Sequence, residues 1–188
     1  MNVSRHAELS ELLLFEPRVH ADARGSFAEL YVAERYEAAG LSATFVQDNV
    51  SFSHRHVLRG LHFQHPHGQG KLVTVLGGEV FDVAVDVRSG SPTFGRWAAF
   101  SLSAANLRQL WIPPGFAHGF VVTGDSALVL YKVTAGYVPP DELTIRWDDP
   151  AIGITWPVET PTLSARDAAA PLLADVDRTR LPRWEPRA

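Results

Sequence analysis

Short apolar segments separated by turn residues recur along most of this chain, and their spacing constrains the fold more than any other feature. From residue 72 onward such segments follow one another about every ten residues and are rich in Val, Leu, Ile and aromatic residues, which favour strands. This pattern predicts an all-β fold: an antiparallel sandwich, barrel or jelly roll. The segments that we expect as strands are 72–76, 79–87, 96–102, 108–112, 119–122, 127–134 and 143–147.

Three local signals refine this picture. Gly77-Gly78 stands between the first two expected strands and predicts a two-residue hairpin. Residues 32–39 are typical of a helix, which Gly40 would end. We expect one domain over residues 1–188, with a core at about 10–173 and a loosely ordered tail at 174–188.

The composition excludes several classes of site and partner. Cysteine is absent, so disulfides, thiolate metal sites and cysteine nucleophiles are all excluded. The net charge of −4 offers no general basic field for nucleic acid, and an anionic ligand would need a local cluster of cations. No apolar run reaches the roughly 18 residues that a membrane span needs. The first residues lack the layout of a signal peptide, which predicts a cytoplasmic protein.

Five histidines lie between His54 and His67, and they indicate either a metal site or a place of proton transfer. Pro-Pro-Gly-Phe-Ala-His, ending at His118, matches the second motif of metal-binding cupins. His65-Pro66-His67 has the His-x-His spacing of their first motif, but no acidic residue follows until Glu79. The proline also favours a loop, whereas a metal site needs ligands that converge from fixed elements. We therefore expect no bound metal, and keep a metal-dependent cupin as the alternative.

Strand periodicity places two polar residues on apolar faces. Tyr131 shares one face with Val129 and Val133, and Lys71 shares one with Val73 and Val75. A buried phenol or ammonium group needs a polar partner. Both residues also have purely structural interpretations, as a core tyrosine with a satisfied hydroxyl and as a lysine that reaches water at a strand end.

Nine motifs occur in order along the chain, and together they carry a resemblance. The chain is similar to the dTDP-4-dehydrorhamnose 3,5-epimerase family over roughly residues 10–173. The motifs are DARGSFAE (22–29), FVQDN (45–49), VLRGLHFQ (57–64), QGKLV (69–73), GEVFDVAVD (78–86), SPTFG (91–95), LWIPPGFAHGF (110–120), LYK (130–132) and LSARDAAAP (163–171).

The resemblance implies a homodimeric jelly roll of the cupin type that uses neither metal nor cofactor. It implies a dTDP-4-keto-6-deoxyhexose substrate, inverted at C3, C5 or both, for rhamnose or an antibiotic sugar. His62 would then be the general base, oriented by Asp167, and Tyr131 the general acid on the other face of the sugar. Lys71 would lie near the ketone oxygen, and Asp82 would support the lysine and the tyrosine.

The resemblance also implies a set of substrate-binding residues. Tyr137 would stack on thymine. Ser26 and Arg166 depart from the family pattern, because a bulky apolar residue and a lysine are common there. The other residues that would bind the substrate are Arg24, Phe27, Glu29, Gln47, Asp48, Asn49, Arg59, Lys71, His118, Glu142 and Arg166.

The chemistry of such an epimerisation explains these residue types. A C4 ketone acidifies the hydrogens on C3 and C5, so inversion needs a base on one face of the ring and a proton donor on the other. Histidine, with an ordinary pKa near 6.5, is largely neutral at pH 7, and tyrosine stays protonated until a carbanion forms. A cation at the enolate oxygen and arginines at the diphosphate complete the requirements.

One point of geometry requires an irregular strand. Arg59 and His62 are three residues apart, so a regular strand would direct them to opposite faces. We therefore predict a bulge or twist at Gly60. A nucleotide-sugar binding module without catalysis is a further alternative, and in such a module replacing His62 by alanine would change nothing measurable.

Overall fold

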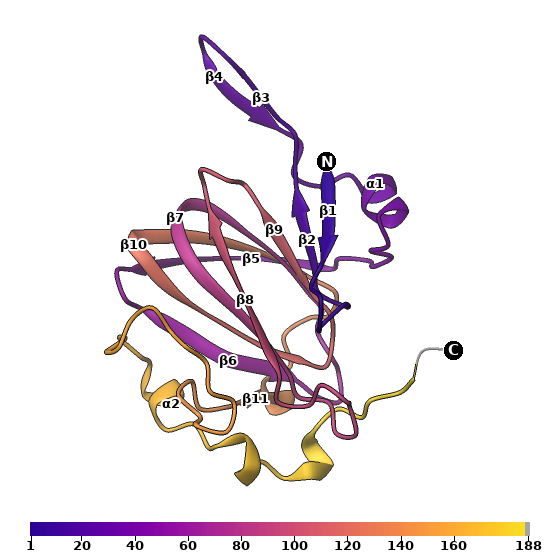
Figure 1. The fold of residues 1–188 in the computed structure, drawn as a ribbon, viewed down its shortest axis with the longest axis vertical. Helices are drawn as coiled ribbons and strands as arrows, with labels where there is room; N and C mark the ends of the chain where they lie inside the picture. Colours follow the sequence, from indigo (N-terminus) through magenta and orange to yellow (C-terminus); the bar gives the residue numbers. More distant parts are fainter. Residues whose placement is uncertain (187–188) are drawn as a thin grey trace.

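Two long antiparallel strands organise the computed structural model, which describes residues 1–186 (Figure 1). They are β7 (Lys71–Asp86) and β10 (Phe116–Val133), and each takes part in both layers of the fold. The first part of β7 pairs with β9 (Gln109–Ile112), and the second part pairs with β8 (Trp97–Ser103). β10 pairs with β6 (Leu58–Gln64) near its start and with β5 (Gln47–His54) near its end.

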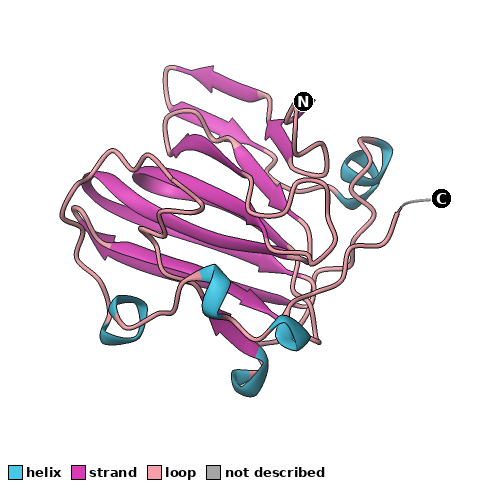
Figure 2. Cartoon of the chain, turned by 60° about the horizontal axis from the view of Figure 1, so that its bottom comes forward, coloured by secondary structure: helices cyan, strands magenta, loops and turns pink. Residues whose placement is uncertain are grey.

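The remaining elements extend or cover these layers. β1, β2 and β9 continue one layer from β7, while β11 extends the other from β6. Figure 2 shows that the short helices lie outside the strands. The antiparallel jelly roll predicted from the sequence is confirmed. The other elements are β1 (Asn2–Arg5), β2 (Leu13–Glu16), β3 (Val19–Asp22), β4 (Gly25–Ala28), β11 (Glu142–Thr144), α1 (Ala33–Ala38), α2 (Ala165–Ala168) and the 3-10 helices Pro139–Asp141, Leu173–Asp175 and Arg178–Arg180.

Alternation along β7 divides its apolar side chains between the inside and the outside of the jelly roll. Val73 and Val75 belong to the cluster between the two layers. Leu72 points the other way, into a cluster that includes Tyr36 of α1, as expected for a residue of opposite parity. Val83 lies in a third cluster, which the C-terminal segment covers. The face that carries Val73 therefore also carries Lys71 to the interior.

The predicted hairpin at Gly77-Gly78 is wrong, because β7 continues through both glycines. The register against β10 shifts here, and Gly78 adopts a positive φ of 73°. A Cβ at Gly78 would meet the backbone oxygen of Ser126 at 1.7 Å. The glycines therefore permit a bulge within one bent strand, a role that the sequence signal does not distinguish from a turn.

The helix and the last strands predicted from the sequence are present in the structure. The helix at 32–39 is confirmed as α1, and Gly40 follows it with φ 93°. The two segments 119–122 and 127–134 are parts of β10. The described part of the segment 174–188 packs on the core, where Val176 and Leu181 are buried. None of the helices in residues 1–186 has the length and apolarity needed to cross a membrane.

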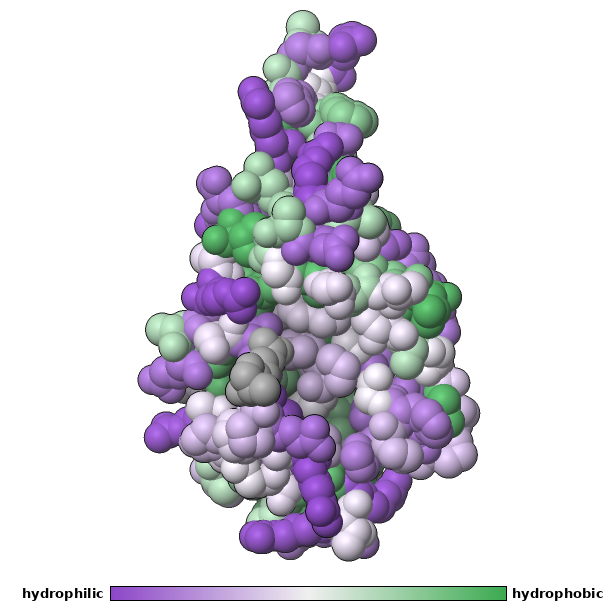
Figure 3. Space-filling model, turned by 90° about the vertical axis from the view of Figure 1, so that its right-hand side faces the viewer, coloured by the Kyte–Doolittle hydropathy of each residue, from purple (hydrophilic) through white to green (hydrophobic). Residues whose placement is uncertain are grey.

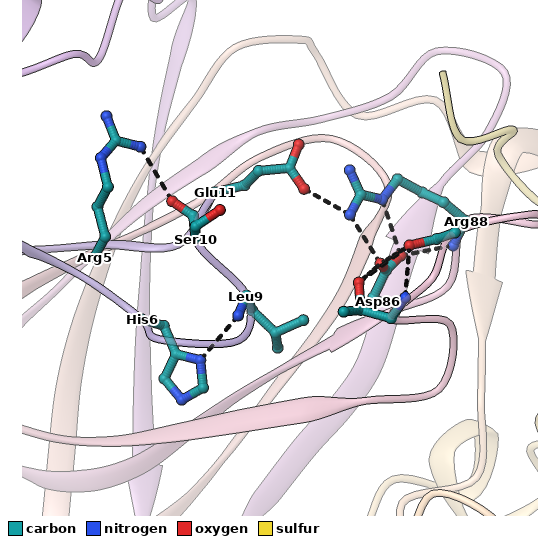
Figure 4. A network of polar contacts seen from close by, with 9 residues as sticks. Arg5, His6, Leu9, Ser10, Glu11, Asp86 and Arg88 are labelled. Atoms are coloured by element: carbon teal, nitrogen blue, oxygen red, sulfur yellow. Dashed lines mark hydrogen bonds and ion pairs between the residues drawn. The ribbon is translucent and has the colours of Figure 1, made fainter. Parts of the chain in front are cut away.

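A buried polar network ties the N-terminal segment to the end of β7 (Figure 4). The carboxylate of Asp86 accepts hydrogen bonds from the Arg88 guanidinium at 2.9 and 2.8 Å. The hydroxyls of Ser91 and Thr93 donate to the same carboxylate at 2.6 and 2.7 Å. The Arg88 guanidinium also pairs with Glu11 at 2.6 Å. Burial raises the pKa of Asp86, but these hydrogen bonds outweigh it and hold the pKa below its usual value.

Candidate active site

A cavity of about 550 Å³ opens between the strands and gathers half of the residues expected at the site. Side chains from β5, β6, β7, β10 and β11 line it, and residues 162–167 close it. The wall is therefore built from segments far apart in the chain. The predicted residues that line this cavity are Arg59, His62, Lys71, His118, Tyr131, Glu142, Arg166 and Asp167.

His62 and Asp167 form a hydrogen-bonded pair in this cavity. His62 Nε2 lies 2.7 Å from Asp167 Oδ1. Asp167 lies in α2, where its backbone N–H donates to the Ser164 hydroxyl that caps the helix. Burial raises the pKa of Asp167, but the hydrogen bond from His62 and further hydrogen bonds hold it below the usual value. Asp167 is therefore an anion that can orient the imidazole and stabilise its protonated form.

The predicted irregularity at Gly60 is confirmed. The register between β6 and β10 shifts between His118 and Phe120, so that Arg59 and His62 both reach the cavity. Gly60 has a φ of 130°, and a Cβ there would meet Gly119 Cα at 2.5 Å. A glycine is required both by the backbone conformation and by the close approach of β10.

Tyr131 projects from β10 into the same cavity. Its hydroxyl lies 2.9 Å from the Ser51 hydroxyl, and its ring packs against those of His118 and Phe120. Burial raises the pKa of Tyr131 well above its ordinary value, although the hydrogen bond with Ser51 opposes this effect. The phenol is therefore held in its protonated form, as an acid that gives up its proton only to a strong base.

Lys71 occupies the start of β7, in the same wall. Its Nζ donates to the backbone carbonyl of His62 at 3.3 Å. Burial lowers the pKa of Lys71 to about 8, against the opposing effect of Glu142 and Asp82. The ammonium group thus lies near the half-buried carboxylate of Glu142 and the buried carboxylate of Asp82, where its charge acts with little screening from water.

His118 and Asp82 form a second, buried pair, in which His118 lines the cavity and Asp82 lies behind it. The distances from His118 Nε2 to the two carboxylate oxygens of Asp82 are 3.0 and 2.9 Å. Asp82 therefore bonds directly to His118, and its influence on Lys71 and Tyr131 is through its charge.

Arg59 is fixed by groups of β5. Its Nε donates to the Ser53 hydroxyl at 2.9 Å, and its Nη2 donates to the backbone carbonyl of Phe52 at 3.3 Å. Among residues 1–186, Nη1 of this guanidinium has no hydrogen-bond partner, so it is available to a ligand. A planar cation held in this way suits phosphate oxygens.

A smaller cavity of about 350 Å³ adjoins the first and shares Lys71, Tyr131 and Glu142 with it. Tyr137 lines it, and its hydroxyl donates to Glu142 at 2.7 Å. Arg166 pairs with the same carboxylate. The hydrogen bond to Glu142 raises the pKa of Tyr137. Two further predicted binding residues, Gln47 and Asn49, line this second cavity.

Four predicted binding residues lie elsewhere. Arg24 and Phe27 belong to the hairpin of β3 and β4, which projects from the body of the molecule (Figures 1 and 3). The Arg24 side chain is 90% exposed and pairs with Asp22. Glu29 follows this hairpin and pairs with Arg35.

Asp48 is the fourth, and it lies on the outward face of β5, paired with Lys132. The alternation of a strand explains this, because its neighbours Gln47 and Asn49 face the cavity. The chain thus does not bring these four residues to its own cavity.

Sequence reasoning missed three serines that support the site. Ser51 and Ser53 continue the inward-facing alternation of Gln47 and Asn49, so strand parity alone could have found them. Ser164 stands three residues before Asp167, as a helix-capping residue does. All three support a predicted site residue rather than carry a charge of their own.

The histidines that raised the question of a metal are separated in the structure. Within residues 1–186, no three His, Asp or Glu side chains gather in a way that could hold a metal ion. His67 pairs with Asp141, whereas His62 pairs with Asp167 and His118 with Asp82.

Comparisons with known proteins show which family the chain resembles. The family model of dTDP-4-dehydrorhamnose 3,5-epimerase matches residues 6–175. The dTDP-4-dehydrorhamnose 3,5-epimerase of Salmonella typhimurium is 56% identical over 168 residues, which cover 88% of this chain and 92% of that protein.

Solved structures show the same fold. A dTDP-6-deoxy-D-glucose-3,5-epimerase from Legionella pneumophila, in complex with dTDP-4-keto-L-rhamnose, has a TM-score of 0.95 and 50% identity, covering 98% of this chain and 99% of that one. A 3'-monoepimerase from Streptomyces bikiniensis, in complex with dTDP-quinovose, has a TM-score of 0.89 and 36% identity, covering 96% of this chain and 93% of that one. The chain belongs to the dTDP-4-dehydrorhamnose 3,5-epimerase family.

Proposed function

We propose that this protein inverts C3, C5 or both carbons of a dTDP-4-keto-6-deoxyhexose, by proton transfer through an enolate, in the synthesis of a deoxysugar. One observation carries the proposal: His62 and Tyr131 come from different strands and line one cavity, together with Lys71. Inversion beside a ketone needs a base, an acid and a cation at the oxygen, and these three side chains supply them. The whole chain would act as one epimerase domain.

The hydrogen bond to Asp167 assigns the nitrogen atoms of His62. Nε2 carries the proton that is donated to the carboxylate, so Nδ1 holds the free lone pair. Nδ1 would take the proton from the carbon next to the ketone, and the electron pair of that C–H bond would move onto the ketone oxygen. Lys71 would stabilise the enolate oxygen. Tyr131 would then donate its proton to the opposite face of the carbon, and the ketone would form again.

The rest of the pocket supports a nucleoside diphosphate. Arg59, fixed by Ser53, would bind the diphosphate. Tyr137 is exposed at the mouth of the second cavity, where its ring is free to stack on a thymine base. Gln47 and Asn49 would supply polar contacts beside it.

We also propose that the protein is a homodimer in which the projecting hairpin reaches the partner's cavity. Arg24 and Phe27 belong to the expected binding set, yet the hairpin that carries them extends away from its own body (Figure 1). Phe27 is 67% exposed, and Val50 and Phe52 form an exposed apolar face on β5. A second copy would cover apolar surface and would give each hairpin a site to complete.

The reaction is tested by incubating the protein with dTDP-4-keto-6-deoxyglucose in D2O and following each carbon by NMR. We expect deuterium at C3, C5 or both, with inversion at each exchanged carbon. The pattern of labelling distinguishes a 3,5-epimerase from a monoepimerase. A substrate that is intact, and that shows exchange at neither carbon, would refute the proposal.

Two variants separate the roles of base and acid. His62→Asn should abolish both exchange and inversion, because it removes the group to which the proposal assigns proton removal. Tyr131→Phe should keep part of the exchange while losing inversion, because His62 can return a deuteron to the face from which it took the proton. If exchange and inversion were lost to the same extent in both variants, the assignment of His62 as the base and Tyr131 as the acid would be wrong.

A further inference from the structure

Ser51 stands next to the phenol that the proposed function makes the acid. The side chains of β5 alternate, so Ser51 faces the cavity while Val50 and Phe52 are exposed on the other side. The Ser51 hydroxyl lies 2.9 Å from the hydroxyl of Tyr131, across the pair of strands β5 and β10. Within residues 1–186, Ser51 is the one side chain that forms a hydrogen bond with this phenol.

The direction of this hydrogen bond matters for catalysis. A phenol has one proton, and either hydroxyl can be the donor in this pair. If Tyr131 donates to Ser51, its proton points away from the substrate and cannot reach the carbanion. If Ser51 donates, the proton of Tyr131 is free to point into the cavity. An acid at Tyr131 therefore requires Ser51 as the donor.

The hydrogen bond between Ser51 and Tyr131 also affects the phenolate that forms when Tyr131 has given up its proton. Tyr131 packs against the rings of His118 and Phe120, so a phenolate there is poorly solvated. An O–H bond donated by Ser51 would stabilise that anion, together with the nearby charge of Arg59. Consistent with this role, the hydrogen bond with Ser51 lowers the pKa of Tyr131 against the effect of burial.

We propose that Ser51 is a positioning residue that directs the proton of Tyr131 toward the sugar and then returns a proton to the phenolate. This inference rests on the proposed function. When the phenolic O–H bond breaks and the new C–H bond forms, the negative charge moves from the enolate to the phenolate. The Ser51 proton then passes to the phenolate oxygen while the serine oxygen takes a proton from a water molecule in the cavity. The hydroxide that remains is neutralised, through solvent, by the proton that the His62 imidazolium releases. The proton delivered to carbon is thus replaced from water, and both hydroxyls return to their starting state.

The experiment measures inversion and deuterium exchange together in D2O for wild type and Ser51→Ala. We expect kcat for inversion to fall by about tenfold to a hundredfold, as for loss of a hydrogen bond to a charged group. KM should change by less than about threefold, because Ser51 is not needed to bind the substrate in the ground state. Exchange by His62 should continue, so that the ratio of exchange to inversion rises by at least about tenfold.

Two further variants control for structural damage. Ser51→Thr keeps a hydroxyl on a strand position that accepts β-branched residues, and it should restore the wild-type ratio. Ser53→Ala removes the other inward-facing hydroxyl of β5, which holds Arg59, and it should raise KM without changing the ratio.

Three results would overturn the inference: inversion at the wild-type rate in Ser51→Ala, equal loss of exchange and inversion, or a Thr variant as impaired as the Ala variant. Wild-type protein without any exchange would instead refute the proposed function itself, and the inference with it.

Discussion

His62 and Asp167 are 105 residues apart in the chain, yet His62 Nε2 lies 2.7 Å from Asp167 Oδ1. The two residues meet because α2 packs against β6 and because the Ser164 cap fixes the start of that short helix. The carboxylate is 3% exposed, while the imidazole reaches the cavity. The anion thus faces the imidazole and not the solvent, an arrangement that fixes the tautomer of a base.

Asp167→Asn should lower kcat by about a hundredfold or more, because the amide keeps the shape but no longer stabilises the imidazolium that forms. KM should change little, since the Asp167 carboxylate is hydrogen-bonded to His62 and is not assigned a contact with the substrate. Steady-state kinetics with the keto sugar measure both constants. Arg146 and Asp148 form an exposed ion pair away from the cavity, so Asp148→Asn serves as the matched control and should keep wild-type kinetics. A kcat for Asp167→Asn within about threefold of wild type would contradict the assigned role.

The dependence of kcat/KM on pH should show the titration of the Lys71 ammonium group. Burial lowers its pKa to about 8, so the ammonium loses its proton as the pH rises through that value. The cation is the form that stabilises an enolate, and kcat/KM should therefore fall on the alkaline side with an apparent pKa near 8. Lys71→Arg keeps its charge at these pH values, and whatever activity it retains should not show this fall. An alkaline limb that is identical in the two proteins would assign the titration to another group.

Much of this site could be predicted from the sequence because strand parity is a local property. The alternation of Lys71 with Val73, and of Tyr131 with Val129, already indicated polar groups on inward apolar faces, where both are found. The irregularity at Gly60 followed from the spacing of Arg59 and His62. These inferences need only the geometry of one strand.

Other features depend on contacts that a single segment does not encode. Gly77-Gly78 permits either a turn or a bulge, and the choice depends on β10, whose backbone lies against Gly78. Asp82 acts on Lys71 and Tyr131 through its charge, as expected, but its hydrogen bond to His118, which lies diagonally across from it on β10, was not foreseen. Arg24 was expected at the site, although its hairpin leaves the body of its own chain (Figure 1). Each of these depends on the pairing of distant strands or, in the proposed homodimer, on a second chain.

Gly60→Ala should disturb the site through β10. An alanine here would have to adopt the strained positive φ of Gly60, and its Cβ would meet Gly119 Cα at 2.5 Å. We therefore expect a loss of about 3 kcal/mol in the free energy of unfolding. Gly90→Ala is the matched control: Gly90 has a φ of 85°, but its Cβ would have nothing within 4 Å, and only the strain of about 1–2 kcal/mol applies. Urea unfolding of the two variants measures the difference. Equal losses would show that β6 can move away from β10 at no cost.

Asp86→Ala should be strongly destabilising without touching the cavity. It would leave the buried Arg88 guanidinium without its main partner, which typically costs about 3–5 kcal/mol. The exposed pair of Arg146 and Asp148 provides the comparison, and Asp148→Ala should cost less than about 1 kcal/mol.

The Asp86 contribution should also depend on pH. The folded pKa lies below the ordinary value, so the stabilisation is present above about pH 4 and is lost as the pH falls through the folded pKa. The difference between wild type and Asp86→Ala in urea unfolding should therefore narrow in acid. A difference that is constant from pH 7 to pH 2 would show that packing, and not the ionised carboxylate, accounts for it.

The proposed exchange of hairpins between two copies can be tested by mixing inactive proteins. Arg24→Ala lacks the hairpin cation and His62→Asn lacks the base, so each homodimer should be strongly impaired. In a mixed dimer, the cavity with an intact His62 receives the hairpin of the other chain, which carries an intact Arg24. Equal mixing with random reassembly should thus restore roughly a quarter of the wild-type activity, because half the dimers are mixed and each has one complete site. If Arg24 instead acted in the cavity of its own chain, no mixed dimer would contain a complete site, and mixing would restore nothing.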